Sequence, residues 1–124
     1  MDINKDLVAA SATALILSIL SEGESYGYAI IQRVRELSGG HLQWTDGMLY
    51  PVLHRLQKQG LIKSTQRLSE QGRRRKYYHV TNQGEKALSE HKNQWLAVHS
   101  TLTRIWEQVP CLSLRMRSPI GETG

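Results

Sequence analysis

The 124-residue sequence contains a single cysteine, Cys111, which excludes an internal disulfide and any metal site built from several thiolates. This scarcity is typical of proteins from a reducing cytoplasm, so a cytoplasmic location is expected. Long apolar runs are also absent: residues 7–20 are interrupted by three hydroxyl side chains and are too short to span a bilayer. No basic flank of the kind found in signal peptides precedes them. We therefore expect no membrane partner.

Motifs that carry catalysis or nucleotide binding are missing as well. The sequence has no P-loop, dinucleotide fingerprint, metal-ligand cluster or nucleophile motif, and its five histidines are scattered. We therefore expect no catalytic residue, no metal site, no cofactor and no enzyme activity.

Acidic side chains are scarce in one part of the chain. Residues 45–79 hold eight of the 16 Lys and Arg but only two of the 11 Asp and Glu, a balance of +6. Because the whole chain carries +5, the remainder is close to neutral at −1. A basic zone on a nearly neutral body is typical of a nucleic-acid binder, although an anionic membrane surface would attract it too.

A predicted helix at the centre of this zone begins after Thr45, its N-cap, and ends at Gly60, which is suited to a left-handed conformation. Pro51 predicts a bent first turn. Apolar residues recur at i, i+3, i+4 and i+7 on one side of the helix, which we expect to be buried: Leu49, Val52, Leu53 and Leu56. The other side carries hydrogen-bonding and cationic groups: Gly47, Tyr50, Pro51, His54, Arg55 and Lys58.

Two helices and a short strand are predicted before this central helix. Residues 7–20 are apolar nearly all round, so this helix is either shared with a second subunit or buried at the centre of the domain. Ser25 is the predicted cap of a helix over 26–37, and residues 41–44 suit a short strand. A helix, a short link and a second helix with a basic side form the helix-turn-helix layout.

After Gly60 the hydrophobic pattern alternates, and residues 61–68 and 75–80 predict a β-hairpin. Its loop carries a turn glycine and four consecutive cations: Gly72, Arg73, Arg74, Arg75 and Lys76. A charge run is often a solvated surface. Beside a recognition-type helix, however, this loop is interpreted as the wing of a winged helix-turn-helix.

Thr81 or Asn82 is predicted to open the last helix, and Pro110 to close it. One side of it repeats apolar residues every three or four positions, with one histidine among them: Leu88, His91, Trp95, Val98, Leu102, Ile105 and Val109. Such a heptad seam on a small domain needs a partner helix, so a homodimer is predicted. We expect a mainly α fold with a small β-hairpin: a winged helix-turn-helix over residues 1–81, a dimerisation helix over 82–109 and a flexible tail over 110–124.

The assembled motifs resemble the PadR family of transcriptional regulators. They are SYGYAI (25–30), GMLYPVLHRL (47–56) leading into GLI (60–62), and GRRRKYYHVT (72–81) followed by Gly84. The resemblance implies a dimer that binds pseudo-palindromic double-stranded operator DNA, usually as a repressor released by a small molecule. The expected DNA-binding residues are Tyr26, Thr45, Gly47, Tyr50, His54, Arg55, Lys58, Gly72, Arg73, Arg74, Arg75 and Lys76.

The length of the last helix is similar to that of the small-chain branch, which has multidrug-responsive and phenolic-acid-responsive members. Trp95 stands where drug-responsive members carry a tryptophan that faces the dimer centre, which implies a pocket for a planar aromatic effector lined by His91, Trp95, Val98 and His99. Trp95 as a filler of the dimer core and His91 as a tolerated polar core residue remain alternatives. The alternative function is a winged-helix module that binds proteins, which predicts apolar or acidic groups on the exposed side of the central helix.

Overall fold

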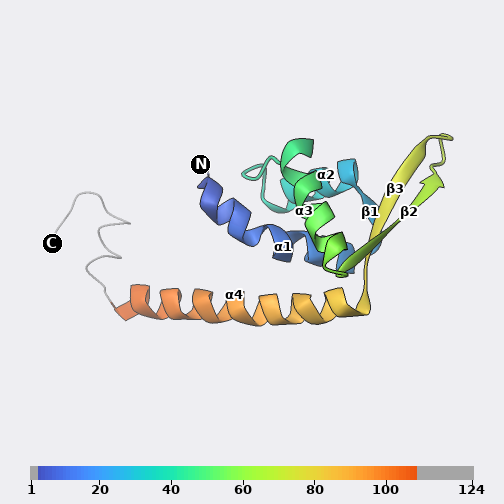
Figure 1. Cartoon of the computed structure of the whole chain (residues 1–124). Helices are drawn as coiled ribbons and strands as arrows, with labels where there is room; N and C mark the ends of the chain where they lie inside the picture. Colours follow the sequence, from blue (N-terminus) through green and yellow to red (C-terminus); the bar gives the residue numbers. More distant parts are fainter. Residues whose placement is uncertain (1–2, 109–124) are drawn as a thin grey trace. The chain divides into compact units, whose positions relative to one another are not determined.

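The computed structural model describes residues 3–108 (Figure 1). In this range the elements are α1 (Lys5–Ser21), β1 (Ser25–Tyr26), α2 (Gly27–Leu37), α3 (Asp46–Lys58), β2 (Ile62–Leu68), β3 (Arg74–Val80) and α4 (Asn82–Gln108). They form two compact units, the first ending at Ser89 and the second beginning at Glu90. The predicted fold class is confirmed, because a helix-turn-helix, a small antiparallel sheet and a long helix follow one another. Pro110 and the tail 110–124 lie outside the described residues.

The core of the first unit is built around α1, which is nearly uniformly apolar and contacts the other two helices and the sheet. The buried residues are Ala12, Ile16, Leu17, Ile19, Leu20, Ile30, Val34, Trp44, Leu49, Leu53, Leu56, Ile62 and Tyr78. Each fully buried Leu or Ile side chain stabilises the fold by about 1.5–3 kcal/mol. Three of the leucines belong to the predicted stripe of α3, and its fourth member, Val52, is partly buried. The core therefore fixes which side of α3 faces outwards.

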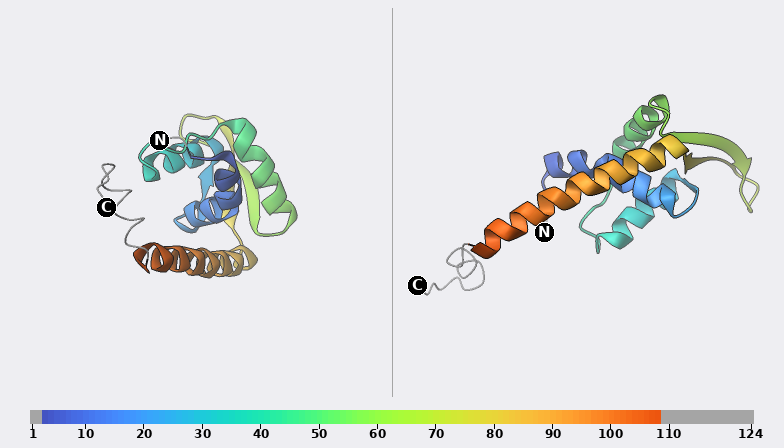
Figure 2. Two further views of the ribbon diagram at one scale, coloured as in Figure 1. Left: turned by 90° about the vertical axis from the view of Figure 1, so that its left-hand side faces the viewer. Right: turned by 90° about the horizontal axis from the view of Figure 1, so that it is seen from below.

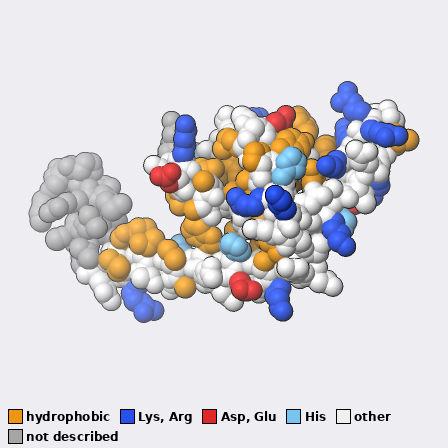
Figure 3. Space-filling model, in the orientation of Figure 1, with side chains coloured by type: hydrophobic (Ala, Val, Ile, Leu, Met, Phe, Trp, Pro, Cys, Tyr) orange, Lys and Arg blue, Asp and Glu red, His pale blue; other side chains and the backbone are white. Residues whose placement is uncertain are grey.

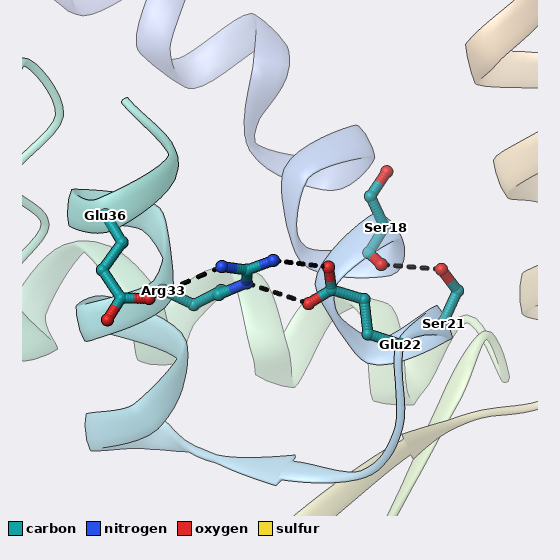
Figure 4. A network of polar contacts seen from close by, with 5 residues as sticks. All are labelled: Ser18, Ser21, Glu22, Arg33 and Glu36. Atoms are coloured by element: carbon teal, nitrogen blue, oxygen red, sulfur yellow. Dashed lines mark hydrogen bonds and ion pairs between the residues drawn. The ribbon is translucent and has the colours of Figure 1, made fainter. Parts of the chain in front are cut away.

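Arg33 of α2 ties this helix to the C-terminal end of α1 (Figure 4). Its Nε donates to Glu22 Oε1 at 3.0 Å and its Nη2 donates to Oε2 at 2.9 Å, while Nη1 lies 3.5 Å from Glu36 Oε1. The hydrogen bonds from Arg33 lower the pKa of Glu22. A two-pronged guanidinium–carboxylate pair fixes orientation as well as distance, so it holds α2 in place beside α1.

The sheet has the strand order β1–β3–β2, and both pairings are antiparallel. β2 and β3 form the predicted hairpin, which extends beyond the three helices in both Figure 1 and Figure 2. The prediction that Ser25 caps a helix is wrong, since Ser25 pairs with Tyr78 and Tyr26 with Tyr77 as strand β1. Tyr26 has φ −125° and ψ 165°, and α2 begins at Gly27. Pairing with β3 therefore overrides the local capping preference.

The strand predicted over residues 41–44 is also wrong. Gly39 and Gly40, with φ of 63° and 88°, end α2 as expected, and the chain then continues as a loop to Thr45. Trp44, which is 5% exposed, anchors this loop by packing into the core. One buried side chain thus holds the connection between α2 and α3 without a strand ladder.

Two tight junctions connect the helices to the hairpin. At the end of α3, Gly60 has φ 77° and its N–H donates to the carbonyl of Gln57, while the Leu61 N–H donates to the carbonyl of Leu56. These are the bonds of a Schellman motif, so Gly60 ends the helix as predicted. At the start of α4, Thr81 Oγ1 accepts from the Gly84 N–H at 3.0 Å, and the Thr81 N–H donates to the Leu61 carbonyl at 3.0 Å. The two junctions are therefore bonded to each other.

Pro51 lies inside α3, which begins at Asp46 after Thr45. Thr45 occupies the N-cap position with extended backbone, but its side chain makes no capping hydrogen bond there.

Among residues 3–108, no helix is both long and apolar enough to cross a membrane.

Candidate nucleic-acid interface

The exposed side of α3 carries the groups that the sequence predicts. Thr45, Gly47, Tyr50, His54 and Lys58 are all exposed, and the buried leucines lie on the opposite side. A helix held by its apolar side in this way presents its polar side as one continuous surface. The hydrogen-bonding and cationic groups of α3 are therefore free to contact a ligand.

Arg55 differs from the other predicted contacts. It is exposed, but its Nη2 donates to Thr13 Oγ1 of α1 at 2.8 Å. The same side chain also lines a hollow of about 670 Å³ together with His54, Gln57, Lys58 and Lys76. Arg55 thus lies between α1 and the cationic surface, and its hydrogen bond to α1 holds part of the guanidinium away from that surface.

The wing is a short turn closed by backbone and hydroxyl hydrogen bonds. The Ser69 N–H donates to the Arg73 carbonyl at 2.8 Å, and Ser69 Oγ accepts from the Arg73 N–H at 3.1 Å. Gly72 has φ 78°, a conformation that favours glycine over other residues. Arg73, Arg74 and Lys76 are exposed, and Figure 3 shows Lys and Arg side chains gathered at the outer end of the hairpin. Of the four cations predicted for the loop, only Arg73 lies in this turn, and Arg74, Arg75 and Lys76 begin strand β3, so the prediction that the loop holds all four is wrong.

The wing, the start of α2 and α3 meet around a hollow of about 500 Å³. Its lining is Tyr26, Gly27, Tyr28, Tyr50, Arg73, Arg74, Arg75 and Lys76. Gly27 leaves room for Tyr50 here, because a methyl group on its Cα would lie 2.3 Å from the hydroxyl oxygen of Tyr50 and would push that side chain aside. A side chain of α3 thus lies close to the backbone at the start of α2. All the cations of this hollow come from the wing, and no acidic side chain lines it.

The structure brings all twelve predicted DNA-binding residues into the first unit, but two of them are partly covered. The ring of Tyr26 lies under the guanidinium of Arg75, with Cζ 4.2 Å from the ring centroid, and both residues are half-buried. Tyr78, the neighbour of Tyr77 on β3, is buried in the core, and burial raises its pKa, with a smaller contribution from Tyr50.

Sequence reasoning missed Tyr77, whose ring contacts that of Tyr26, and also Arg67 and Glu24, which are linked to Tyr77. Arg67 forms an ion pair with Glu24, and its Cζ lies 4.3 Å from the Tyr77 ring centroid. Strand alternation was the available signal, since a hairpin register that pairs Arg67 with Arg75 places both on one face of the sheet. The link to Glu24 and Tyr26 depends on β1. A strand of two residues is too short to show a periodic pattern in the sequence.

The predicted effector and dimer residues lie on α4. His91, Trp95, Val98 and His99 belong to the second unit, where Val98 is 52% exposed. Leu102 and Ile105 are 40% and 51% exposed. Leu88 belongs to the first unit and packs against its core, and Val109 lies outside the described residues. In the part of the chain that the structure describes, no three His, Cys, Asp or Glu side chains group as metal ligands would.

Comparison with known proteins gives consistent matches. A model of the "Transcriptional regulator PadR-like family" matches residues 16–90. The transcriptional regulator Rv3488 of Mycobacterium tuberculosis is 36% identical over 86 residues, 69% of this chain and 77% of Rv3488. A transcriptional regulator from Clostridium thermocellum has a TM-score of 0.74 and 31% identity, covering 82% of this chain and 96% of its own. A PadR-like transcriptional regulator of Bacillus cereus has a TM-score of 0.73 and 33% identity, with the same coverage.

Proposed function

Because this chain belongs to the PadR-like family of transcriptional regulators, we propose that it is a homodimeric repressor of pseudo-palindromic operators. A small planar aromatic or drug-like effector releases it from DNA. The family is one of DNA-binding regulators and not of enzymes, in agreement with the absence of catalytic motifs from the sequence.

The observation that carries the proposal is the continuity of cationic and hydrogen-bonding groups from α3 to the wing. Tyr50 lines the hollow that Arg73 and Arg74 also line, and His54 and Lys58 line the neighbouring hollow with Lys76. α3 enters the major groove, where Tyr50 and His54 reach base edges, and the wing cations contact phosphates. The protein-binding alternative predicts apolar or acidic groups on the exposed side of α3. Met48 and Asp46 are the residues of α3 that come nearest to this description.

Selection of duplexes from a random-sequence library tests this function. A two-fold dimer places its recognition helices about 34 Å apart, so enriched duplexes should contain two inverted half-sites whose centres are about 10 base pairs apart. Replacing Tyr50 or His54 should change the enriched sequence. Enrichment of no sequence, or of a single unpaired half-site, would contradict the proposal.

Two apolar surfaces of a single chain support the dimer. Three apolar side chains of the seam are exposed on α4 in the second unit: Val98, Leu102 and Ile105. The first unit has a groove of about 840 Å³ between α1, the loop after α2, and α3, lined by Val8, Ala12, Leu42, Met48 and Val52 among others. Leu7 of α1 is also 52% exposed. Exposed apolar surface of this extent is typical of a protein interface, and a second copy of the chain covers it.

The double variant Leu102→Lys, Ile105→Lys tests the dimer. Both residues lie on the seam, so two lysines there should give a monomer in sedimentation equilibrium and abolish operator binding. Leu96→Lys is the matched control, because Leu96 is equally exposed but lies off the seam. A double variant that remains dimeric would refute the assigned interface.

The effector lies between the two subunits at Trp95. A tryptophan on a two-helix seam is too large for close packing, so the helices separate and leave a slot with Val98 at its floor. His91 and His99, about one helical turn to either side, orient a polar or acidic ligand. The ligand changes the angle between the α4 helices and hence the spacing of the recognition helices, which favours a state that fits DNA poorly.

Indole fluorescence tests this effector site. Phenolic and other planar aromatic compounds should quench fluorescence in the wild type and in Trp106→Phe, and the quenching should be lost in Trp95→Ala. Quenching that follows Trp106 instead, or ligands that bind without weakening operator affinity, would contradict the site and its coupling to DNA.

A further inference from the structure

One face of the sheet carries an interlocked set of aromatic and cationic side chains. Along β3, Tyr78 is buried in the core, whereas Arg75 and Tyr77 are half-buried and alternate onto the other face. Tyr26 of β1 is paired with Tyr77, and their rings meet edge to face with centroids 5.5 Å apart at 71°. Arg75 Cζ lies 4.2 Å from the Tyr26 centroid, and Arg67 Cζ lies 4.3 Å from the Tyr77 centroid.

These contacts join all three strands. Arg67 belongs to β2, Arg75 and Tyr77 to β3, and Tyr26 to β1. Arg67 and Arg75 lie directly opposite each other in the hairpin, a like-charge arrangement that is destabilising in isolation. Each guanidinium instead lies over a different aromatic ring, which is a favourable cation–π contact. The two cation–π contacts therefore offset part of the repulsion that this pairing creates.

Glu24 completes the set from outside the sheet. It lies in the turn between α1 and β1, and its Oε1 forms an ion pair with Nη2 of Arg67. This carboxylate thus connects the backbone just before β1 to β2, the first strand of the wing hairpin. Tyr26 and Arg75 also line the hollow shared with Tyr50, so the set borders the proposed DNA surface.

We propose that Glu24 is a positioning residue for DNA recognition, which holds Arg67 on Tyr77 and thereby fixes the wing relative to α2 and α3. Arg75 and Arg67 serve mainly to orient the wing, and Arg73, Arg74 and Lys76 contact phosphates. This role rests on the proposed DNA-binding function. A fixed wing and a fixed recognition helix engage DNA together without a further ordering cost, which favours affinity for the correct site.

The proposal predicts a change in operator affinity opposite in sign to the change expected from charge alone. Removing an acidic side chain near a DNA-binding surface ordinarily strengthens attraction to phosphates. Glu24→Gln should instead weaken operator binding about five-fold, since the released Arg67 no longer holds the wing, while binding to a scrambled duplex stays constant or becomes tighter. The ratio of the two affinities therefore falls.

Glu70→Gln is the matched control. Glu70 lies in the wing turn, and Glu70→Gln removes the same charge as Glu24→Gln. Glu70 is exposed, however, and has no ion-pair partner among residues 3–108. It should strengthen, or leave unchanged, binding to both duplexes. Arg67→Lys keeps a cation over Tyr77 beside Glu24 and should retain most of the wild-type affinity ratio. If Glu24→Gln behaves like Glu70→Gln on both duplexes, Glu24 has no positioning role.

Amide hydrogen exchange without DNA separates this inference from the function itself. Glu24→Gln should accelerate exchange in residues 74–80 by several-fold relative to wild type, whereas Glu70→Gln should not. Unchanged exchange in Glu24→Gln would overturn the positioning role even if the operator is bound. Faster exchange in a protein whose wild type selects no duplex would retain the structural link and refute the DNA-binding function.

Discussion

Gly84→Ala probes the junction between the wing and α4, where the structure leaves no room for a side chain. A methyl group on Gly84 would lie 2.0 Å from the carbonyl oxygen of Leu61 and 2.7 Å from Val80 Cγ2. The Leu61 carbonyl accepts a hydrogen bond from the Thr81 N–H at 3.0 Å, so it is not free to move aside. The substitution therefore has two opposing effects on stability: a gain in helix propensity and a collision of the new methyl group with backbone.

The magnitudes decide the outcome. Alanine is favoured over glycine inside a helix by up to about 1 kcal/mol. Overpacking costs about 1–3 kcal/mol even where side chains can adjust, and a collision with backbone at this distance belongs at or beyond the upper end. We expect a net loss of about 2 kcal/mol, which lowers Tm by about 8–16 °C for a unit of this size.

Thermal unfolding followed by circular dichroism measures the change, and Gly47→Ala is the control. Gly47 also lies in the first turn of a helix, but its nearest neighbour to an added methyl is Thr45 Oγ1 at an ordinary 3.8 Å. Gly47→Ala should raise Tm by a few degrees through helix propensity, roughly 1 kcal/mol at most. A rise of similar size in Gly84→Ala would refute the close approach of α4 to the end of α3.

Three further predictions concern stability and the recognition surface. Thr81→Ala removes the N-cap of α4 and should cost about 1–2 kcal/mol in urea unfolding, whereas a loss below about 0.3 kcal/mol would show that the hydrogen bonds to Gly84 and Gly60 contribute little. The pKa of Glu22 is lowered in the folded state, so its contribution to stability is present above its ordinary value of 4.5 and is lost as pH falls through the lowered pKa. Stability measured against pH should therefore fall less steeply below 4.5 in Arg33→Leu than in wild type, and parallel curves would contradict the ion pair. Gly27→Ala should displace the Tyr50 hydroxyl and weaken operator binding more than Gly39→Asn, which lies in open space at a left-handed position, and equal effects would contradict the role of that contact.

The parts of the fold that follow local chemistry were predictable. The stripe of leucines on α3 is buried, Gly60 ends that helix, and Thr81 caps α4. Each of these depends on residues a few positions apart, because helical periodicity and capping act over one or two turns.

The errors occur where distant residues decide the conformation. The local sequence predicts Ser25 as a helix cap, but Ser25 belongs to β1. It pairs with β3, and a local sequence pattern does not reveal that pairing. The loop before α3 is held by burial of Trp44 and not by strand pairing.

The candidate DNA surface was predictable as a set of cations but not as an arrangement. Four consecutive cations in a hairpin loop indicate a wing, yet sequence alone does not separate the exposed Arg73 and Arg74 from Arg75, which lies on Tyr26. The sequence likewise predicts Arg55 as a DNA contact on the margin of α3, although its guanidinium donates to the Thr13 hydroxyl. In both cases the deciding partner is on another element.

The salt dependence of operator binding tests the central claim most directly. If α3 and the wing face DNA, each subunit neutralises about four phosphates, through Lys58, Arg73, Arg74 and Lys76, and a plot of log affinity against log salt should have a slope of about −7 for the dimer. Replacing Arg73, Arg74 and Lys76 by alanine removes six of about eight contacts, so the slope should flatten to about −2. An unchanged slope in this triple variant would remove the wing from the interface and contradict the account.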